Sequence, residues 1–314
     1  MIVSTHDTRI VVGASSDLSQ ILNLPYSEPL DFNYREISGT HYVAAMATEL
    51  ATDSKINRLV GLLEKIELDN ELVWQVYKDK PVLWLLPNLD AVELTQWVSI
   101  LHQRFPHCFT HSQCRFFPHG SASLFFALNA FESMQEQQKS SAVIISLDSL
   151  YFTLAELESS NALVNDTQDV GQKPAEAAII TIIEATDSGM NIAGLFLENS
   201  SLVQQTQTIQ NLFYQATQTN KNAFNQLYLP SFNQIVIDNW LNAYEKLAGH
   251  IDEESQINQT TIFTGHIGSV AGLYNFLHLF NRYQQHDLSG ISLQLEVSQT
   301  LHLGLAIYSW IEKA

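Results

Sequence analysis

The sequence is poor in cysteine and in basic residues. Only two cysteines, Cys108 and Cys114, occur in 314 residues, so a disulfide framework does not hold the chain together. Lys and Arg number 15 against 33 Asp and Glu, which gives a formal net charge of −18. Such a charge repels the phosphates of nucleic acids and the anionic surface of membranes. We therefore expect neither nucleic acid nor membrane as a partner.

The sequence also lacks long apolar runs and the common cofactor motifs. No run approaches the roughly 20 apolar residues of a membrane-spanning helix, and residues 1–9 do not resemble a secretion signal, so we expect a cytoplasmic protein. There is no phosphate-binding glycine loop, dinucleotide fingerprint or metalloprotease signature, and we expect no cofactor. Hydrophobic residues make up 46% of the chain and charged residues 15%, which excludes disorder of the whole chain.

Apolar periodicity predicts an α/β fold with two related halves, 1–165 and 166–314, separated by a polar stretch at 156–173. Strands alternate with helices in both halves, so we expect sheets that are covered by helices. The predicted strands are 9–13, 81–86, 114–117, 142–147, 177–183, 192–197, 234–238, 261–263, 292–297 and 303–308. The predicted helices are 56–66, 91–105, 124–134, 208–219, 239–247 and 270–280.

One short segment could supply metal ligands. His107, Cys108, His111 and Cys114 lie within eight residues of one another, and His119 follows soon after. Their side chains are ligands that zinc accepts, but the spacing is not one of the usual paired-cysteine patterns. We therefore favour the interpretation that the two cysteines are small, apolar residues on either side of a turn.

Three segments, in this order, resemble the thiolase-like superfamily and in particular its β-ketoacyl synthase branch. Residues 118–124 (PHGSASL) are similar to the family's nucleophile turn, which leads into a buried helix. Residues 171–178 (GQKPAEAA) are similar to the glycine- and proline-containing turn that opens the family's second half. Residues 264–272 (TGHIGSVAG) are similar to the motif that carries a catalytic histidine. The resemblance implies a thiolase-like fold of two related βαβαβ-type halves.

The residue that the family uses as its nucleophile is missing. Condensing enzymes of this family carry the acyl group on a cysteine at the start of the buried helix. Aligning Ala130 with the family's helix alanine places Gly120 at that position. Ser121 and Ser123 follow, but such hydroxyls are more often helix caps than nucleophiles. An alignment that slips by one residue would instead place Ser121 at the nucleophile position.

Other catalytic positions of the family are also altered. Its first catalytic histidine would fall near Pro230, its lysine would fall at Thr261, and its C-terminal glycine-rich loop is replaced by residues 300–304. Only His266 is retained. A lone histidine could donate a hydrogen bond to an oxyanion, but without a nucleophile it makes no enzyme. We favour a packing role for His266, with its ring bonded to a backbone carbonyl.

Two carboxylates near these motifs are interpreted as structural. Glu176 lies in a turn of the family, where a glutamate holds backbone N–H groups. Asp148 follows the predicted strand 142–147, and we expect it to cap a turn or helix rather than to act as a base.

The resemblance implies a non-catalytic partner subunit of the chain-length-factor kind, in polyketide, aryl polyene or fatty-acid-like biosynthesis. It also implies a homodimer, or a heterodimer with an active ketosynthase, formed through the edge strand of the first half near 142–147, with an acyl carrier protein as a further partner. Two alternatives stay open. The chain could be an adaptor or chaperone, for example for a secreted cargo, or an acyl hydrolase or transferase that uses Ser121 with His266.

Overall fold

A large mixed sheet runs through the molecule. The computed structural model describes residues 1–47, 49–135, 140–160, 162–165, 171–299 and 301–313. The first half of the sheet contains β1 (Ile2–Val12), β4 (Val82–Leu85), β5 (Cys114–Phe117), β6 (Ser141–Ser149) and β7 (Glu176–Ala185). The second half contains β8 (Gly189–Asn199), β9 (Gln226–Tyr228), β10 (Gln256–Asn258), β11 (Ile291–Val297) and β12 (His302–Ile311). A separate hairpin consists of β2 (Asn33–Ile37) and β3 (Thr40–Ala44).

The two halves of the sheet have the same topology. The full order is β10-β9-β11-β12-β8-β1-β7-β6-β4-β5. When the strands of each half are numbered along the chain, both halves have the order 3-2-4-5-1. The halves meet where β1 pairs with β8 at Ile2 and Val3. This repeat favours a division between β7 and β8, later than the expected division at 165/166; residues 166–170 of the polar stretch lie outside the described residues.

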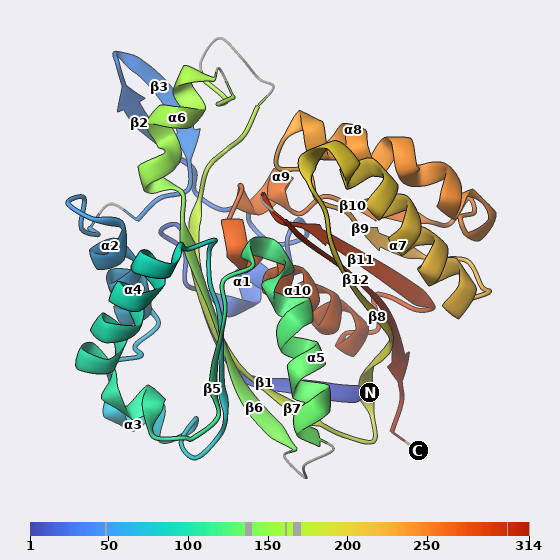
Figure 1. The fold of residues 1–314 in the computed structure, drawn as a ribbon, viewed down its shortest axis with the longest axis horizontal. Coiled ribbons are helices and arrows are strands. Elements are labelled where there is room, and N and C mark those ends of the chain that lie inside the picture. The colour runs from blue at the N-terminus through green and yellow to red at the C-terminus, as the bar shows by residue number, and fades with distance from the viewer. Residues whose placement is uncertain (48, 136–139, 161, 166–170, 300, 314) are drawn as a thin grey trace.

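Helices cover the outer faces of both halves and fill the space between them (Figure 1). α5 and α10 share one hydrophobic core with strands of both halves. α2 and α4 pack on the outer face of the first half, and α7 and α8 pack on that of the second. The bounds are α1 (Leu18–Leu22), α2 (Lys55–Lys65), α3 (Glu71–Trp74), α4 (Ala91–Arg104), α5 (Ser123–Gln135), α6 (Leu154–Ser159), α7 (Gln205–Thr219), α8 (Gln234–Ala243), α9 (Thr261–Thr264) and α10 (Ala271–Gln284).

Six short 3₁₀ helices complete the described elements. Two of them, η2 and η6, lead directly into α5 and α10, and they carry the residues of the site described below. The bounds are η1 (Pro106–Phe109), η2 (Gly120–Ala122), η3 (Tyr151–Thr153), η4 (Leu202–Gln204), η5 (Tyr244–His250) and η6 (Gly268–Val270). Among the described residues, no helix is long and apolar enough to span a membrane.

Two predicted strands are helices in the structure. Residues 234–238 form the start of α8, because the Asn233 side chain accepts a hydrogen bond from the Val236 N–H and caps the helix. Val236, Trp240 and Ala243 then form its buried face, at a spacing of three and four residues. Residues 261–263 belong to the short helix α9. In both places a run of β-branched residues suggested a strand, and helix-forming local contacts prevailed.

The expected edge strand is also wrong. The strand predicted at 142–147 is β6, which lies between β4 and β7 inside the sheet. The free edge of the first half is β5, the strand that leads into Gly120.

Candidate functional site

A cavity of about 210 Å³ lies between the two halves. It brings together four residues singled out in the sequence, which are Gly120, Ser121 and Asp148 from the first half and His266 from the second. Phe232 and His266 also line a second cavity of about 310 Å³, so these two side chains form a wall common to both.

Gly120 forms a sharp turn between β5 and α5. Its φ is +59°, a conformation that glycine adopts without the steric cost of a side chain, and its N–H donates to Leu86 O at 3.2 Å. A Cβ at this position would lie 3.0 Å from Ser298 Oγ. The Ser123 hydroxyl accepts the His119 N–H at 3.1 Å and donates to Phe117 O at 2.7 Å, so it fixes the turn to the end of β5 and is not a helix cap. With Gly120 at the turn, no side chain there can act as a nucleophile.

Ser121 has a structural partner, and its counterpart in the second half, Ser269, has the equivalent partner in the first half. The Ser121 hydroxyl donates to Val297 O at the end of β11, at 3.0 Å. In the other half, the Ser269 hydroxyl donates to Leu147 O near the end of β6, at 2.9 Å. Each serine follows a glycine that begins a 3₁₀ helix. The described hydrogen bonds do not join Ser121 to His266, and the repeat explains Ser121 as a link between the halves.

His266 is buried and neutral. Its backbone N–H donates to Lys173 O at 2.7 Å, and its ring stacks on Phe232 with a centroid distance of 4.8 Å and an interplanar angle of 9°. Burial lowers the pKa of His266 to about 4. Nε2 lies 3.4 Å from the Gln299 amide nitrogen, and the buried Nδ1 has no partner among the described residues. The ring is therefore not bonded to a backbone carbonyl there, contrary to our expectation.

Asp148 caps the turn at Gly268, which is the counterpart of the Gly120 turn in the second half. Its two carboxylate oxygens accept the N–H groups of Ser269 and Ser149, each at 2.8 Å. Gly268, with φ +57°, makes this contact possible, because a Cβ on it would overlap the Asp148 carboxylate. Burial raises the pKa of Asp148, and the two backbone N–H groups oppose that shift. This geometry agrees with the predicted capping role.

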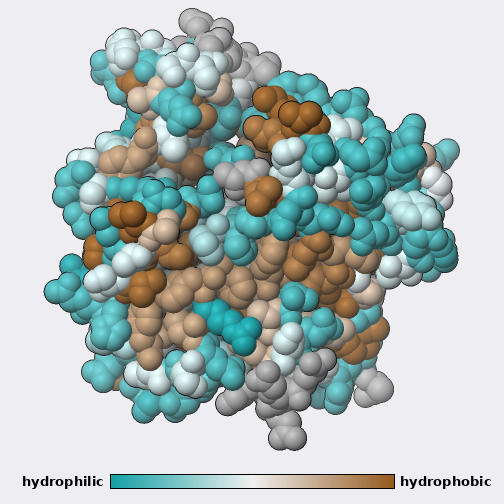
Figure 2. Space-filling view, in the orientation of Figure 1, coloured by the Kyte–Doolittle hydropathy of each residue, from teal (hydrophilic) through white to brown (hydrophobic). Residues whose placement is uncertain are grey.

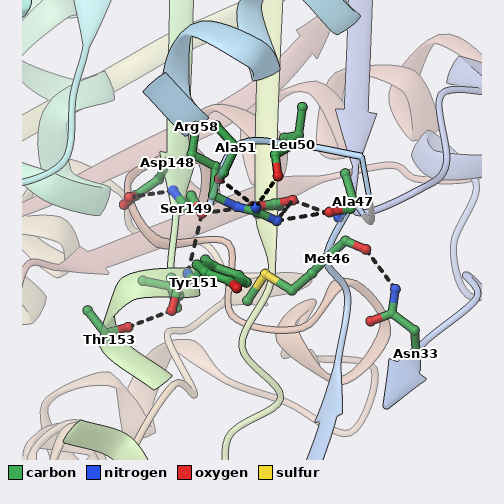
Figure 3. A network of polar contacts seen from close by, with 12 residues as sticks. Asn33, Met46, Ala47, Leu50, Ala51, Arg58, Asp148, Ser149, Tyr151 and Thr153 are labelled. Atoms are coloured by element: carbon green, nitrogen blue, oxygen red, sulfur yellow. Dashed lines mark hydrogen bonds and ion pairs between the residues drawn. The ribbon is translucent and has the colours of Figure 1, made fainter. Parts of the chain in front are cut away.

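Glu176 holds a buried polar network together, and Figure 3 shows its partners Ala47, Arg58 and Ser149. It accepts the Ala47 N–H at 2.6 Å, as predicted for a glutamate that holds backbone groups. It also pairs with Arg58 of α2, whose Nε lies 2.7 Å from Oε2, and accepts the Ser149 hydroxyl at 2.7 Å. The Arg58 guanidinium lies 4.0 Å from the centre of the Tyr151 ring. Sequence reasoning missed Arg58; the available signal was an arginine within the apolar pattern of helix 56–66.

The candidate metal ligands do not converge. Among the described residues, no group of three His, Cys, Asp or Glu side chains could hold a metal ion. His107 Nε2 is bonded to Leu68 O at 2.9 Å, and His111 Nδ1 accepts the Gln113 N–H at 3.0 Å. Cys108 is fully buried, and burial raises the pKa of the Cys114 thiol to about 11. A thiol in this state is a poor metal ligand.

The two other altered family positions lie outside the first cavity's lining. The carbonyl of Pro230 accepts the Trp240 indole N–H at 2.9 Å. Thr261 lines the second cavity, and its hydroxyl bonds to that of Ser231. Thr300, the first residue of the altered loop 300–304, lies outside the described residues.

Comparisons with known proteins agree with this architecture. The sequence matches no protein-family model and no curated protein. Solved structures do match: the ishigamide ketosynthase/chain length factor is 10% identical with a TM-score of 0.69 and covers 99% of both chains. The chain has the thiolase-like ketosynthase fold.

Further structures with this fold support the same conclusion. A ketosynthase in complex with its chain length factor from Xenorhabdus doucetiae is 12% identical, with a TM-score of 0.64 and 98% coverage of both chains. A β-ketoacyl synthase from Burkholderia phymatum is 11% identical, with a TM-score of 0.66, 99% coverage of this chain and 100% of the other. At such identities the likeness establishes the fold, and the activity has to be argued from the site.

Proposed function

We propose that this chain is a non-catalytic partner subunit of a β-ketoacyl synthase, of the chain-length-factor kind, in polyketide, aryl polyene or fatty-acid-like biosynthesis. The observation that carries the proposal is Gly120. The chain has a ketosynthase fold, and Gly120, which the resemblance aligns with the nucleophile position, carries no side chain. The solved structures with this fold include complexes between a ketosynthase and a chain length factor.

The free edge β5 and helix α5 offer a surface for such a partner. β5 is one end of the sheet, so its outward backbone groups are open to pairing with another strand. In Figure 1, α5 lies in front of the strands, with no described helix covering it on the viewer's side. Figure 2 shows mostly apolar surface in the middle of this face. A patch of this kind, next to an open edge, favours a protein partner, and the same surface could form a homodimer.

The test is co-expression with the cysteine-bearing ketosynthases and the acyl carrier proteins of the source organism. We expect one ketosynthase to co-purify at a fixed stoichiometry. The double variant Arg115→Glu with Phe126→Glu places charge on β5 and α5 and should abolish the complex. The control, Gln256→Glu with Ile257→Glu, also introduces two glutamates, on β10 at the opposite edge. It changes the net charge by two units where the first variant changes it by three, and it should leave the complex intact. A complex that survives the first variant contradicts the proposed surface.

The cavity itself favours a second candidate, an adaptor that uses the fold as a docking platform. The cavity is small, and the stacked Phe232 and His266 rings separate it from the next one. A long acyl chain does not fit in about 210 Å³. An adaptor would co-purify with a protein unrelated to ketosynthases, such as a secreted cargo, and that result would exclude the partner-subunit proposal.

A further inference from the structure

Two histidine rings from opposite halves of the sheet meet beside α5. His119 lies between β5 and η2 in the first half, and His302 is the first residue of β12 in the second. Their ring centroids are 4.1 Å apart, at an interplanar angle of 56°. The ring of Phe126 in α5 lies 4.5 Å from the ring of His119 and 5.3 Å from that of His302. The two histidines therefore form a pair with an aromatic ring as one wall.

The ring of His302 has a defined tautomer. His302 and Asn199 lie opposite one another in the ladder between β12 and β8. The side-chain oxygen of Asn199 lies 2.7 Å from Nδ1 of His302. Since this oxygen can only accept a hydrogen bond, Nδ1 carries the ring proton, and Nε2 of the neutral ring keeps its lone pair. A carbonyl oxygen on the opposite ring nitrogen is the arrangement that orients a metal-binding histidine.

The ring of His119 has one nitrogen that a ligand can reach. The Ser123 hydroxyl holds its backbone N–H at 3.1 Å, and its Nδ1 is buried, so Nε2 is the nitrogen left for a ligand. Neither the Nε2 of His119 nor that of His302 forms a hydrogen bond with the described residues, and both atoms have accessible surface. The pair therefore offers two nitrogen atoms that are open to an external ion.

The charge state and the spacing of the two rings suit a metal ion. Burial, and then the nearby His302 ring, lower the pKa of His119 to about 4, and burial lowers the pKa of His302. Both rings are therefore neutral at pH 7, which is the form that binds metals. Two nitrogens of a tetrahedral zinc site are about 3.4 Å apart, a separation that rings with centroids at 4.1 Å reach by side-chain rotation.

We propose that His119 and His302 bind one divalent transition metal ion through their Nε2 atoms, with water in the remaining positions. Imidazole ligands suit zinc, nickel and copper. The described residues offer no third His, Cys, Asp or Glu ligand at the pair, which is why water completes the site. The ion joins the turn before α5 to the start of β12, so binding stabilises the contact between the halves. This proposal does not depend on a ketosynthase partner.

The test is isothermal titration of the full chain at pH 7 with zinc chloride and, separately, with magnesium chloride. We expect one zinc ion to bind per chain and to raise the melting temperature. Magnesium prefers oxygen ligands, so it should do neither. Half a zinc ion per chain, accompanied by dimer formation, would overturn the site as described, because a second chain would then supply ligands in place of water.

Single variants test the two ligands. His119→Asn and His302→Asn should each weaken zinc binding about tenfold or more, because the shorter side chain no longer reaches the ion. The matched control is His286→Asn, which removes an exposed histidine whose ring lies 3.6 Å from the Glu312 carboxylate. It should leave zinc binding unchanged. Melting temperatures without zinc show that each variant is folded. Zinc that binds both ligand variants as tightly as the unchanged chain would overturn the proposal.

Variants of Asn199 test its role as a positioning residue. Asn199→Ala keeps both ligands and removes the oxygen that holds the Nδ1 proton of His302, so zinc should bind about tenfold more weakly. Asn199→Asp keeps an acceptor for that proton and should bind zinc at least as tightly as the unchanged chain. If Asn199→Ala binds zinc as tightly as the unchanged chain, the oriented histidine pair is wrong, and the partner-subunit proposal is unaffected.

Discussion

The two glycine turns at the centre of the molecule have the same backbone and different surroundings. Gly120 and Gly268 have φ values of +59° and +57°, and each is followed by a serine whose hydroxyl bonds to a strand of the opposite half. A Cβ on Gly120 would lie 3.0 Å from a serine hydroxyl at the cavity, whereas a Cβ on Gly268 would overlap the buried carboxylate of Asp148.

Both turns line the same cavity, so the difference lies in the group that each turn packs against. The Gly268 turn packs against the Asp148 carboxylate, which uses both oxygens on backbone N–H groups. The Gly120 turn packs against the Ser298 side chain. A repeated fold can therefore keep the backbone of a turn in both copies and change the group that supports it.

The largest expected effect concerns the buried ion pair of Arg58 with Glu176. Arg58→Met leaves the Glu176 carboxylate buried without its counter-ion. It also disturbs Ser149, whose hydroxyl donates to Glu176 and whose N–H donates to the Asp148 carboxylate. We expect a loss of about 3–5 kcal/mol in the free energy of unfolding, measured by urea denaturation. Arg9→Met, which removes the exposed ion pair with Glu67, is the control and should cost less than about 1 kcal/mol. Similar losses for both would contradict the role of the network.

Substitution of the two glycines compares the turns directly. In Gly268→Ala the new side chain is strained by the left-handed backbone and also overlaps with Asp148. We expect the free energy of unfolding to fall by about 3 kcal/mol or more. Gly120→Ala has the same backbone cost, but its new side chain contacts only the Ser298 hydroxyl, which can move. We expect the free energy of unfolding to fall by about 1–2 kcal/mol. The measurement is urea denaturation of both variants, and equal losses would show that the surroundings do not differ as described.

A third prediction concerns β11, the strand to which Ser121 is hydrogen-bonded. Burial raises the pKa of Glu296 in β11 to about 7 from a usual value of 4.5, and hydrogen bonds from Gln294 and Asn275 oppose the shift. The folded chain then binds a proton that the unfolded chain releases between these pH values, so stability from this group falls as pH rises from about 4.5 to 7. Glu296→Gln keeps an acceptor for both neighbours and removes the titration.

Relative to the unchanged chain, Glu296→Gln should therefore gain stability from pH 5 to pH 8, by at most about 1.4 kcal/mol per pH unit in the window. The measurement is the free energy of unfolding of both proteins across that range. The buried histidines, His266 and His278, contribute to both proteins and cancel in the difference. A difference that is independent of pH would contradict the raised pKa.

We expect the smallest loss of stability from the two serine variants, and we expect it to be equal in the two halves. Ser121→Ala and Ser269→Ala each remove one buried bond from a hydroxyl to a carbonyl, and we expect each to cost about 1 kcal/mol. Neither should alter hydrolysis of acyl thioesters, which should stay at background. Turnover that is present in the unchanged chain and absent in Ser121→Ala would instead identify Ser121 as a nucleophile.

Sequence reasoning recovered the elements whose pattern is local. β5 has the bounds predicted from the residues, and α2 and α5 differ from theirs by one residue at each end, because an apolar face at helical spacing is readable without tertiary context. The hairpin of β2 and β3 was missed. Its strands alternate weakly and pair with one another outside the main sheet, so little in their residues marks them as strands.

The site was only half predictable for a related reason. Motif order placed Gly120, Ser121 and His266 near one another. Lys55 and Phe232 were missed, since each reaches the cavity from a segment whose position depends on distant contacts. Arg58 and Glu176, which fix the helix that carries Lys55, are 118 residues apart, and no local pattern connects them.

The position of β1 dictates when the first half can become native during synthesis. β1 is the first strand of the chain, yet its long ladder is with β7, in the register Val3 with Ala185 and Val12 with Ala177. The segment up to Ala185 must leave the ribosome before this ladder can close. Until then β1 exposes apolar residues and unpaired edges, a state that favours aggregation and the action of chaperones. We therefore expect slow acquisition of protease resistance in nascent chains that end before Ala185.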